Sequence, residues 1–115
     1  MSFTPPVEKI KGQIREVAVG AEGKVGGEST FPFHLWEGEM PNPPMIAMEV
    51  YDEPQPEWPE AVRKVYDDVM EDPVAWARKC QDELGADAIC LQLRSTDPNG
   101  SDASPESAAE TVKKV

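Results

Sequence analysis

Polar side chains follow each of two apolar segments in the chain, residues 45–51 and residues 88–93. If both segments are parallel strands, these side chains lie at the carboxyl edge of the sheet, where α/β barrels build their ligand sites. Hydroxyl, amide and carboxylate groups at such an edge can hydrogen bond to the polar groups of a bound molecule. The residues selected as candidate cofactor contacts are Asp52, Thr96, Asp97 and Asn99.

The second of these loops also has a purely structural interpretation. Residues 96–100 are Thr-Asp-Pro-Asn-Gly, and tight turns use these residue types for reasons of backbone geometry. For any single residue the turn interpretation is the stronger one. The loop as a whole is still expected on the ligand side, because it follows a strand.

Other residues that could carry chemistry are isolated. Glu49 interrupts an apolar segment, and a carboxylate in a buried strand must be paired or protonated, so a structural salt bridge and a role near a ligand both remain open. His34 stands beside Trp36 among prolines, where surface packing is favoured over metal ligation. Cys80 and Cys90 fall at apolar positions and are expected to be buried free thiols. No residue is assigned a catalytic or metal-binding role.

The second part of the chain has the element order of an α/β fold. Residues 45–51 and 88–93 are expected to be buried strands, and the segments between and after them are expected to be helical. The order of strand, two helices, strand and helix predicts parallel strands joined by crossovers. The first expected helix runs from Pro59 to about Glu71 and carries an apolar stripe of Val62, Val65, Tyr66 and Val69. The second is capped at Asp72-Pro73, ends at Gly85 and has the apolar residues Trp76, Ala77, Cys80 and Leu84. The third is capped at Ser104-Pro105, and its expected buried face is Ala108, Val112 and Val115.

The first part of the chain, residues 1–44, has a different character. Val7, Ile10, Ile14 and Val17 fit one helical face, although Gly12 weakens that pattern, so a short helix or an arm is expected. Glycines between residues 20 and 27 favour a small β-hairpin, and prolines between residues 31 and 44 favour an extended strap. We therefore divide the chain into an arm, hairpin and strap at 1–44 and the first βαβα units at 45–115.

The totals exclude several classes of function. Lys and Arg number 11 against 22 Asp and Glu, giving a formal charge of −11, and such a surface repels nucleic acid. No stretch approaches the roughly 20 apolar residues that span a bilayer, and the first residues do not form a signal peptide. No membrane association is expected, and a cytoplasmic location is favoured.

Several blocks in the right order resemble a known family. They are residues 26–33, Gly-Gly-Glu-Ser-Thr-Phe-Pro-Phe; residues 37–42, Glu-Gly-Glu-Met-Pro-Asn; and residues 46–50, Ile-Ala-Met-Glu-Val. The match continues at Asp72-Pro73, at Trp76-Ala77 and at Thr96-Asp97-Pro98. From residue 26 onward the chain resembles the small subunit of the corrinoid iron–sulfur protein, called subunit delta of the acetyl-CoA decarbonylase/synthase complex in archaea.

This resemblance implies the fold class and the function. The fold implied is the N-terminal portion of a TIM-type (β/α)8 barrel, which as a whole needs about 250 residues, and the absence of a helix stop at Val115 fits a fold that continues. The barrel pairs with a large subunit that carries an iron–sulfur cluster and a cobalt corrinoid. The corrinoid takes a methyl group from a methyl-pterin methyltransferase and passes it to acetyl-CoA synthase, in the reductive acetyl-CoA (Wood-Ljungdahl) pathway of one-carbon metabolism. The present chain is then a non-catalytic scaffold.

Two functions of other classes remain as alternatives. A pterin-binding methyltransferase barrel would need acidic and amide residues converging from several strands, of which Asp52, Asp97 and Asn99 could be the first. An acidic protein-interaction module would need the chain to fold by itself. The blocks between residues 26 and 50 favour the corrinoid scaffold.

Overall fold

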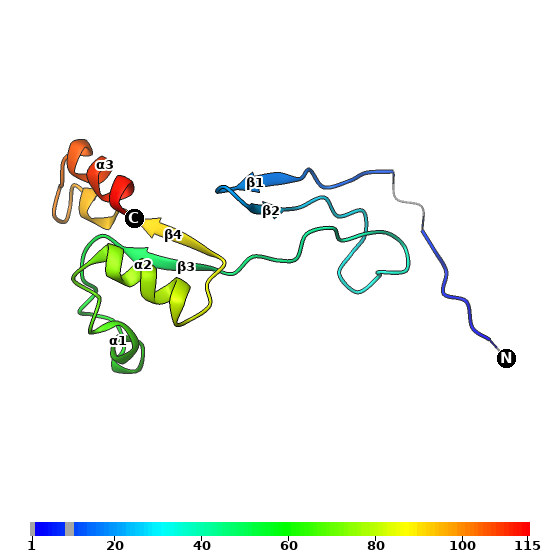
Figure 1. The fold of residues 1–115 in the computed structure, drawn as a ribbon, viewed down its shortest axis with the longest axis horizontal. Helices are drawn as coiled ribbons and strands as arrows, with labels where there is room; N and C mark the ends of the chain where they lie inside the picture. The colour runs from blue at the N-terminus through cyan, green and yellow to red at the C-terminus, as the bar shows by residue number, and fades with distance from the viewer. Residues whose placement is uncertain (1, 9–10) are drawn as a thin grey trace. The chain divides into compact units, whose positions relative to one another are not determined.

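The computed structural model describes residues 2–8 and 11–115. The chain divides into two compact units, Met1–Met45 and Ile46–Val115, which are considered separately. Figure 1 shows a hairpin in the first unit and a parallel strand pair with helices in the second. The fold class is therefore α/β, as predicted.

The first unit is built on an antiparallel hairpin. Strands β1 (Val17–Val19) and β2 (Gly23–Val25) pair with Val17 opposite Val25. The pairing extends beyond the strands through Ile14, whose amide donates to the Glu28 carbonyl at 2.9 Å. Gly26 follows with a φ of 82°, and a Cβ there would lie 2.3 Å from the Arg15 carbonyl oxygen, so only glycine fits.

The helical alternative for the start of the chain is wrong within the described residues. Residues 2–8 and 11–16 are not helical, and Val17 lies in a strand, while Ile10 falls outside the described residues. A β-branched residue such as Val17 packs well in a pleated strand, and Gly12 disfavours helix. The hairpin favoured by the glycines is present.

The second unit pairs two strands in parallel. β3 (Ala47–Tyr51) and β4 (Ala88–Gln92) are in register from Ala47 opposite Ala88 to Tyr51 opposite Gln92. The crossover between them contains α1 (Glu60–Tyr66) and α2 (Pro73–Asp82). A 3-10 turn, η1 (Arg94–Thr96), and α3 (Pro105–Lys114) follow β4. This order is the strand, helix pair, strand and helix that the sequence predicts.

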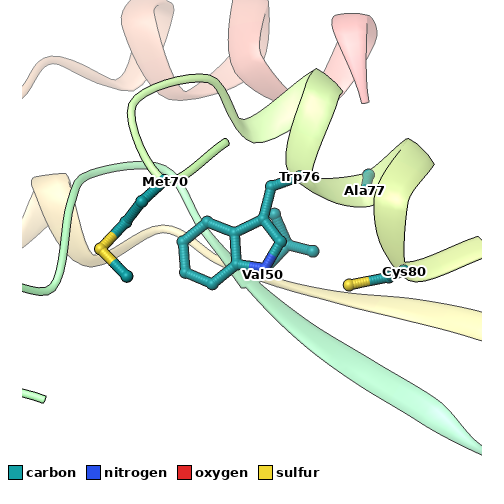
Figure 2. Packing of buried hydrophobic residues seen from close by; sticks show 5 residues of the cluster. All are labelled: Val50, Met70, Trp76, Ala77 and Cys80. Carbon is teal, nitrogen blue, oxygen red and sulfur yellow. The ribbon is translucent and has the colours of Figure 1, made fainter. Parts of the chain in front are cut away.

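The core of this unit forms where α2 lies against β3 and β4. Figure 2 shows the indole of Trp76 at the centre of the cluster, between Met70 and Cys80. Trp76, Cys80 and Val50 are completely buried. Tyr51, Trp58 and Tyr66 pack around the indole, with ring centroids 5.2 to 6.0 Å from it. Large aromatic side chains remove much apolar surface from water and so stabilise this small core.

Local signals in the sequence correctly place the ends of two helices. The Asp72 carboxylate accepts hydrogen bonds from the amides of Val74 and Ala75 at 2.9 and 3.3 Å, satisfying donors that the helix itself leaves unpaired. Gly85 has a φ of 71°, and after it the Ala86 amide returns to the Cys80 carbonyl at 2.9 Å. Ser104 caps α3 by accepting from the Ser107 amide.

The prediction that both strands are buried is wrong for one face of the sheet. Glu49 and Cys90 are register partners, and both are exposed, while Met48, Val50 and Leu91 pack toward the core. Ile46 is exposed as well. An apolar run signals burial on both faces, but α2 covers one face in the described residues. Cys90 is thus an exposed free thiol, whereas Cys80 is buried as predicted.

Because Glu49 is exposed, burial does not require its carboxylate to be paired or protonated. Its carboxylate accepts hydrogen bonds from the Tyr51 hydroxyl at 3.1 Å and from the side-chain amide of Gln92 at 3.3 Å. Burial, together with the hydrogen bond to Glu49, raises the pKa of the Tyr51 hydroxyl.

The predicted helix faces are only partly buried. α1 ends at Tyr66 instead of near Glu71, because the chain turns there to bring Val69 and Met70 to the core. Val62 and Val65 stay exposed. On α3 Ala108 is buried, whereas Val112 is 54% exposed and Val115 is also exposed. Leu84 lies beyond the end of α2 and is exposed too.

The Asp72 cap leads to a stability prediction. Replacing Asp72 by Ala leaves two amides of α2 without their acceptor and should lower the free energy of unfolding by about 1 kcal/mol. Asp82→Ala is the control, because Asp82 is an exposed carboxylate at the other end of the same helix. Urea unfolding followed by circular dichroism measures both, and equal stability of the two variants would contradict the capping role.

Burial of Tyr66 leads to a pH prediction. Burial raises the pKa of the Tyr66 hydroxyl above its ordinary value of about 10. The folded state then holds a proton that the unfolded chain has already lost, so the related stability is complete below about pH 10 and is lost as the pH rises through the folded pKa. Melting temperatures of the wild type should fall more steeply above pH 10 than those of Tyr66→Phe. If the melting temperatures of the two proteins fall in parallel above pH 10, Tyr66 has the same pKa in the folded and the unfolded state.

Candidate functional site

The loops after β3 and β4 leave the same edge of the sheet. Parallel pairing brings the carboxyl ends of the two strands together, and the Asp52 amide extends the ladder by donating to the Gln92 carbonyl at 3.2 Å. Residues 52–59 form the first loop and residues 93–104 the second. The edge that they form is here called the carboxyl rim.

Asp52 joins the two loops. Its carboxylate accepts a hydrogen bond from the Ser95 amide at 3.0 Å and another from the Ser95 hydroxyl at 2.5 Å. Hydrogen bonds to a charged acceptor are stronger than neutral ones, and these are partly shielded from water. Asp52 therefore fixes the position of η1 relative to the end of β3.

Arg94 and Gln55 form a second connection between the loops. The Arg94 guanidinium donates to the Gln55 side-chain oxygen at 2.6 Å, and Gln55 is only 1% exposed. The Gln55 amide donates in turn to the Glu53 carbonyl at 3.0 Å. Arg94 also lies 3.1 Å from the Glu57 carboxylate and 3.9 Å from that of Glu53. A buried amide satisfied at both ends holds the first loop in one conformation.

The remaining predicted residues lie along the second loop and are exposed. The Thr96 hydroxyl donates to the Leu93 carbonyl at 2.7 Å, while the Asp97 carboxylate accepts from the Asn99 amide at 2.8 Å. Asp97 also accepts through its carbonyl from Gly100 and Asp102. These are the hydrogen bonds of a tight turn. Among the described residues, hydrogen bonds connect Asp52 to Ser95 and Gln92, not to Thr96, Asp97 or Asn99.

An apolar groove lies beside Thr96, between the second loop and α3. Its volume is about 810 Å³. Most of the lining side chains are apolar, and the polar ones are Thr96, Asp102 and Lys113. The groove is lined by Leu93, Thr96, Asp102, Ala103, Pro105, Ala108, Ala109, Val112 and Lys113.

The chain matches a family model over most of its length. The model is described as CO dehydrogenase/acetyl-CoA synthase delta subunit, and it matches residues 16–115. The chain belongs to this delta-subunit family. It is also 41% identical over 63 residues to the acetyl-CoA decarbonylase/synthase complex subunit delta of Methanocaldococcus jannaschii. That match covers 47% of the chain and 15% of the relative, so the chain spans a small part of the relative's length.

The delta-subunit chain holds its carboxyl rim with residues that the pattern of the sequence does not single out. Gln55 lies between Pro54 and Pro56, and nothing in such a segment indicates that its amide is buried. Ser101 donates to the Glu53 carboxylate at 2.7 Å and adds another connection between the loops. These contacts depend on the parallel register, which only the fold supplies.

In residues 2–8 and 11–115 of this delta-subunit chain, no three His, Cys, Asp or Glu side chains come together in an arrangement suited to a metal ion. Within the same residues, every helix is too short or too polar to cross a membrane.

Ser95 offers a direct test of how the delta-subunit rim is held. Ser95→Ala removes the hydroxyl donor to Asp52 and should lower the free energy of unfolding by about 1 kcal/mol. Amides of residues 93–104 should also exchange faster with solvent. Ser107→Ala is the control, since Ser107 is an exposed serine in α3. If hydrogen exchange in the second loop is the same in both variants, the hydroxyl hydrogen bond from Ser95 to Asp52 does not hold η1 in place.

Proposed function

We propose that the chain forms part of the small subunit of a corrinoid iron–sulfur protein and helps to hold its cobalt corrinoid at the carboxyl rim. Membership of the delta-subunit family supports this proposal. The observation that carries it is the connection of two strand-end loops at one edge of a parallel sheet by Asp52–Ser95 and Gln55–Arg94. Such edges are where α/β barrels place their ligands.

The fold that goes with this function is a TIM-type (β/α)8 barrel. In this proposal residues 45–115 supply its first βαβα units, and residues 1–44 are the arm, hairpin and strap that precede it. The parallel pairing of β3 and β4 across a helical crossover, with α3 following β4, supports this proposal, because such a barrel alternates parallel strands with helices.

The residues at the rim fit a corrinoid. A corrinoid combines a large apolar ring with amide side arms, and the rim offers an apolar groove next to exposed hydroxyl and amide groups. Thr96, Asp97 and Asn99 would hydrogen bond to the side arms. Asp52 would serve the same site through Ser95, because its carboxylate keeps η1 in place.

The bound corrinoid supplies a cobalt that carries a methyl group, and the chain contributes position and shielding. Arg94 and Gln55 keep the first loop fixed, so that little conformational entropy is lost on binding. The apolar side chains of Leu93, Ala103 and Ala108, which line the groove, would exclude water from a corrinoid bound there. The chain itself has no catalytic role in this proposal.

The proposed partners follow from the same function. They are a large subunit that carries the iron–sulfur cluster and shares the corrinoid, a methyl-pterin methyltransferase, and acetyl-CoA synthase. The relative's name describes it as a subunit of a complex. We also propose a cytoplasmic location, without nucleic acid or a membrane as partner.

Asn99 tests the cofactor assignment in the complete small subunit paired with its large partner. Asn99→Ala removes one amide partner and should weaken corrinoid retention by about 1 kcal/mol, roughly fivefold. The melting temperature should barely change, because Asn99 is exposed. Corrinoid occupancy is read from visible absorbance after dialysis.

Gly100→Ala is the matched control for this measurement. Gly100 does not have a positive φ, and a Cβ there would lie 3.6 Å from the Asp97 carbonyl oxygen, an ordinary contact. The variant should therefore keep both occupancy and stability. Equal occupancy in the Asn99 and Gly100 variants would leave the second loop as a turn without contact to the cofactor.

A further inference from the structure

Residues 29–39 form a loop that presents large apolar side chains to solvent. We call this segment the aromatic loop. Phe33, at its tip, is 86% exposed. Exposed apolar side chains that are adjacent in one loop differ from the isolated ones normal on protein surfaces, and they mark interaction sites. The exposed apolar side chains of the loop are Phe31, Phe33, Leu35 and Trp36.

The base of the aromatic loop is closed by hydrogen bonds. The Ser29 amide donates to the Glu39 carbonyl at 3.0 Å, and the Glu39 amide donates to the Ser29 hydroxyl at 2.9 Å. Gly38 lies against Ser29 so closely that a Cβ would be 2.7 Å from the Ser29 hydroxyl. The two ends of the loop are thus held together without a side chain between them.

The interior of the loop is ordered as well. Thr30 is buried and donates through its hydroxyl to the His34 carbonyl at 2.7 Å. The His34 amide donates to the Phe31 carbonyl at 2.9 Å, and the Glu37 amide donates to the His34 carbonyl at 2.8 Å. Consecutive turns therefore direct the polar backbone inward while the Phe31 and Phe33 rings remain outside.

Trp36 is held in place by two neighbours. The His34 ring stacks on it with centroids 5.1 Å apart, and its indole N–H donates to the Pro6 carbonyl at 3.3 Å. The His34 Nδ1 atom lies 3.2 Å from the Glu37 carboxylate. His34 therefore packs against Trp36, as the sequence favours. A fixed indole loses little side-chain entropy when it binds.

The charges around the loop limit what can cover it. Residues 26–45 contain Glu28, Glu37 and Glu39 and neither Lys nor Arg. A second copy of the chain would bring like charges together, and the formal charge of −11 opposes such self-association. Anionic lipid would be repelled for the same reason. The complementary surface is an apolar groove bordered by Lys and Arg on another protein.

We propose that the aromatic loop docks, as a preformed anchor, into a basic-rimmed apolar groove of a partner protein. The inference rests on the proposed function, because the partner is taken to be the large corrinoid-carrying subunit. A rigid loop bearing adjacent Phe and Trp side chains has the composition of an interface centre, where a few anchors carry most of the binding energy.

Phe33 and Phe3 form a matched pair for the test. Phe3 is 84% exposed and lies outside the aromatic loop. In the complete small subunit, Phe33→Ser should weaken binding to the purified large subunit about 30-fold, the effect of losing one anchor. Phe3→Ser should leave the dissociation constant unchanged. Biolayer interferometry at fixed ionic strength measures both variants.

A second pair of variants tests whether the partner's groove is bordered by basic residues. Glu39→Lys reverses an exposed carboxylate of the loop, while Glu22→Lys makes the same change in the turn of the β1–β2 hairpin. Wild-type association should slow as salt is raised, and only Glu39→Lys should reduce both the association rate at low salt and its dependence on salt. Equal association rates and equal salt dependence of the two charge variants would contradict a basic border on the partner's groove.

The remaining outcomes distinguish a failure of the docking surface from a failure of the proposed function. If the wild type binds the large subunit and Phe33→Ser binds equally well, the docking surface is refuted while the proposed function stands. If the wild type does not bind the large subunit, both fail. A lower melting temperature of the uncomplexed Phe33→Ser subunit would show that the chain itself covers the loop. Phe33-dependent self-association, or Phe33-dependent binding to phosphatidylglycerol vesicles, would likewise overturn the proposed partner.

Discussion

The burial of one indole ring is the constraint on which the 46–115 unit depends. Trp76 removes a large apolar surface from water, and it contacts aromatic side chains from β3 and from the crossover. Without it, α2 would lose the largest of the three buried side chains that it contributes to the core. The ring is buried at a cost, because its N–H has no hydrogen-bond partner among the described residues. The several aromatic contacts, each contributing about 0.5–1.5 kcal/mol beyond burial, offset that cost.

The carboxyl rim is a consequence of this packing. With α2 held against the sheet, β3 and β4 stay in register, and their two following loops meet. Asp52, Arg94 and Gln55 then find partners more than 35 residues away in the chain. The two loops of the rim are therefore joined by hydrogen bonds between residues that could not meet in an isolated loop.

Features that depend on neighbouring residues can be predicted from the sequence, whereas features that depend on distant residues cannot. The caps at Asp72 and Ser104 and the stop at Gly85 were predicted correctly, because each depends on a few neighbouring residues. The family was predicted from ordered blocks and is confirmed. Burial of Cys90 was predicted wrongly, because exposure depends on what covers a sheet face and not on the apolar run itself. Asp52, Thr96, Asp97 and Asn99 lie in the loops after β3 and β4, and their role as cofactor contacts stays a prediction. The sequence alone does not indicate that Ser95 engages Asp52, because that contact depends on the pairing of the two strands.

Glu49 has a further consequence for the behaviour of the unfolded chain. The segment around it is rich in apolar and β-forming residues, the kind of sequence that assembles into intermolecular sheets when it is exposed. A carboxylate in the middle of β3 makes each stacked copy bring a negative charge beside another. The side chain that interrupts the apolar strand is therefore expected to disfavour aggregation whenever this segment is exposed.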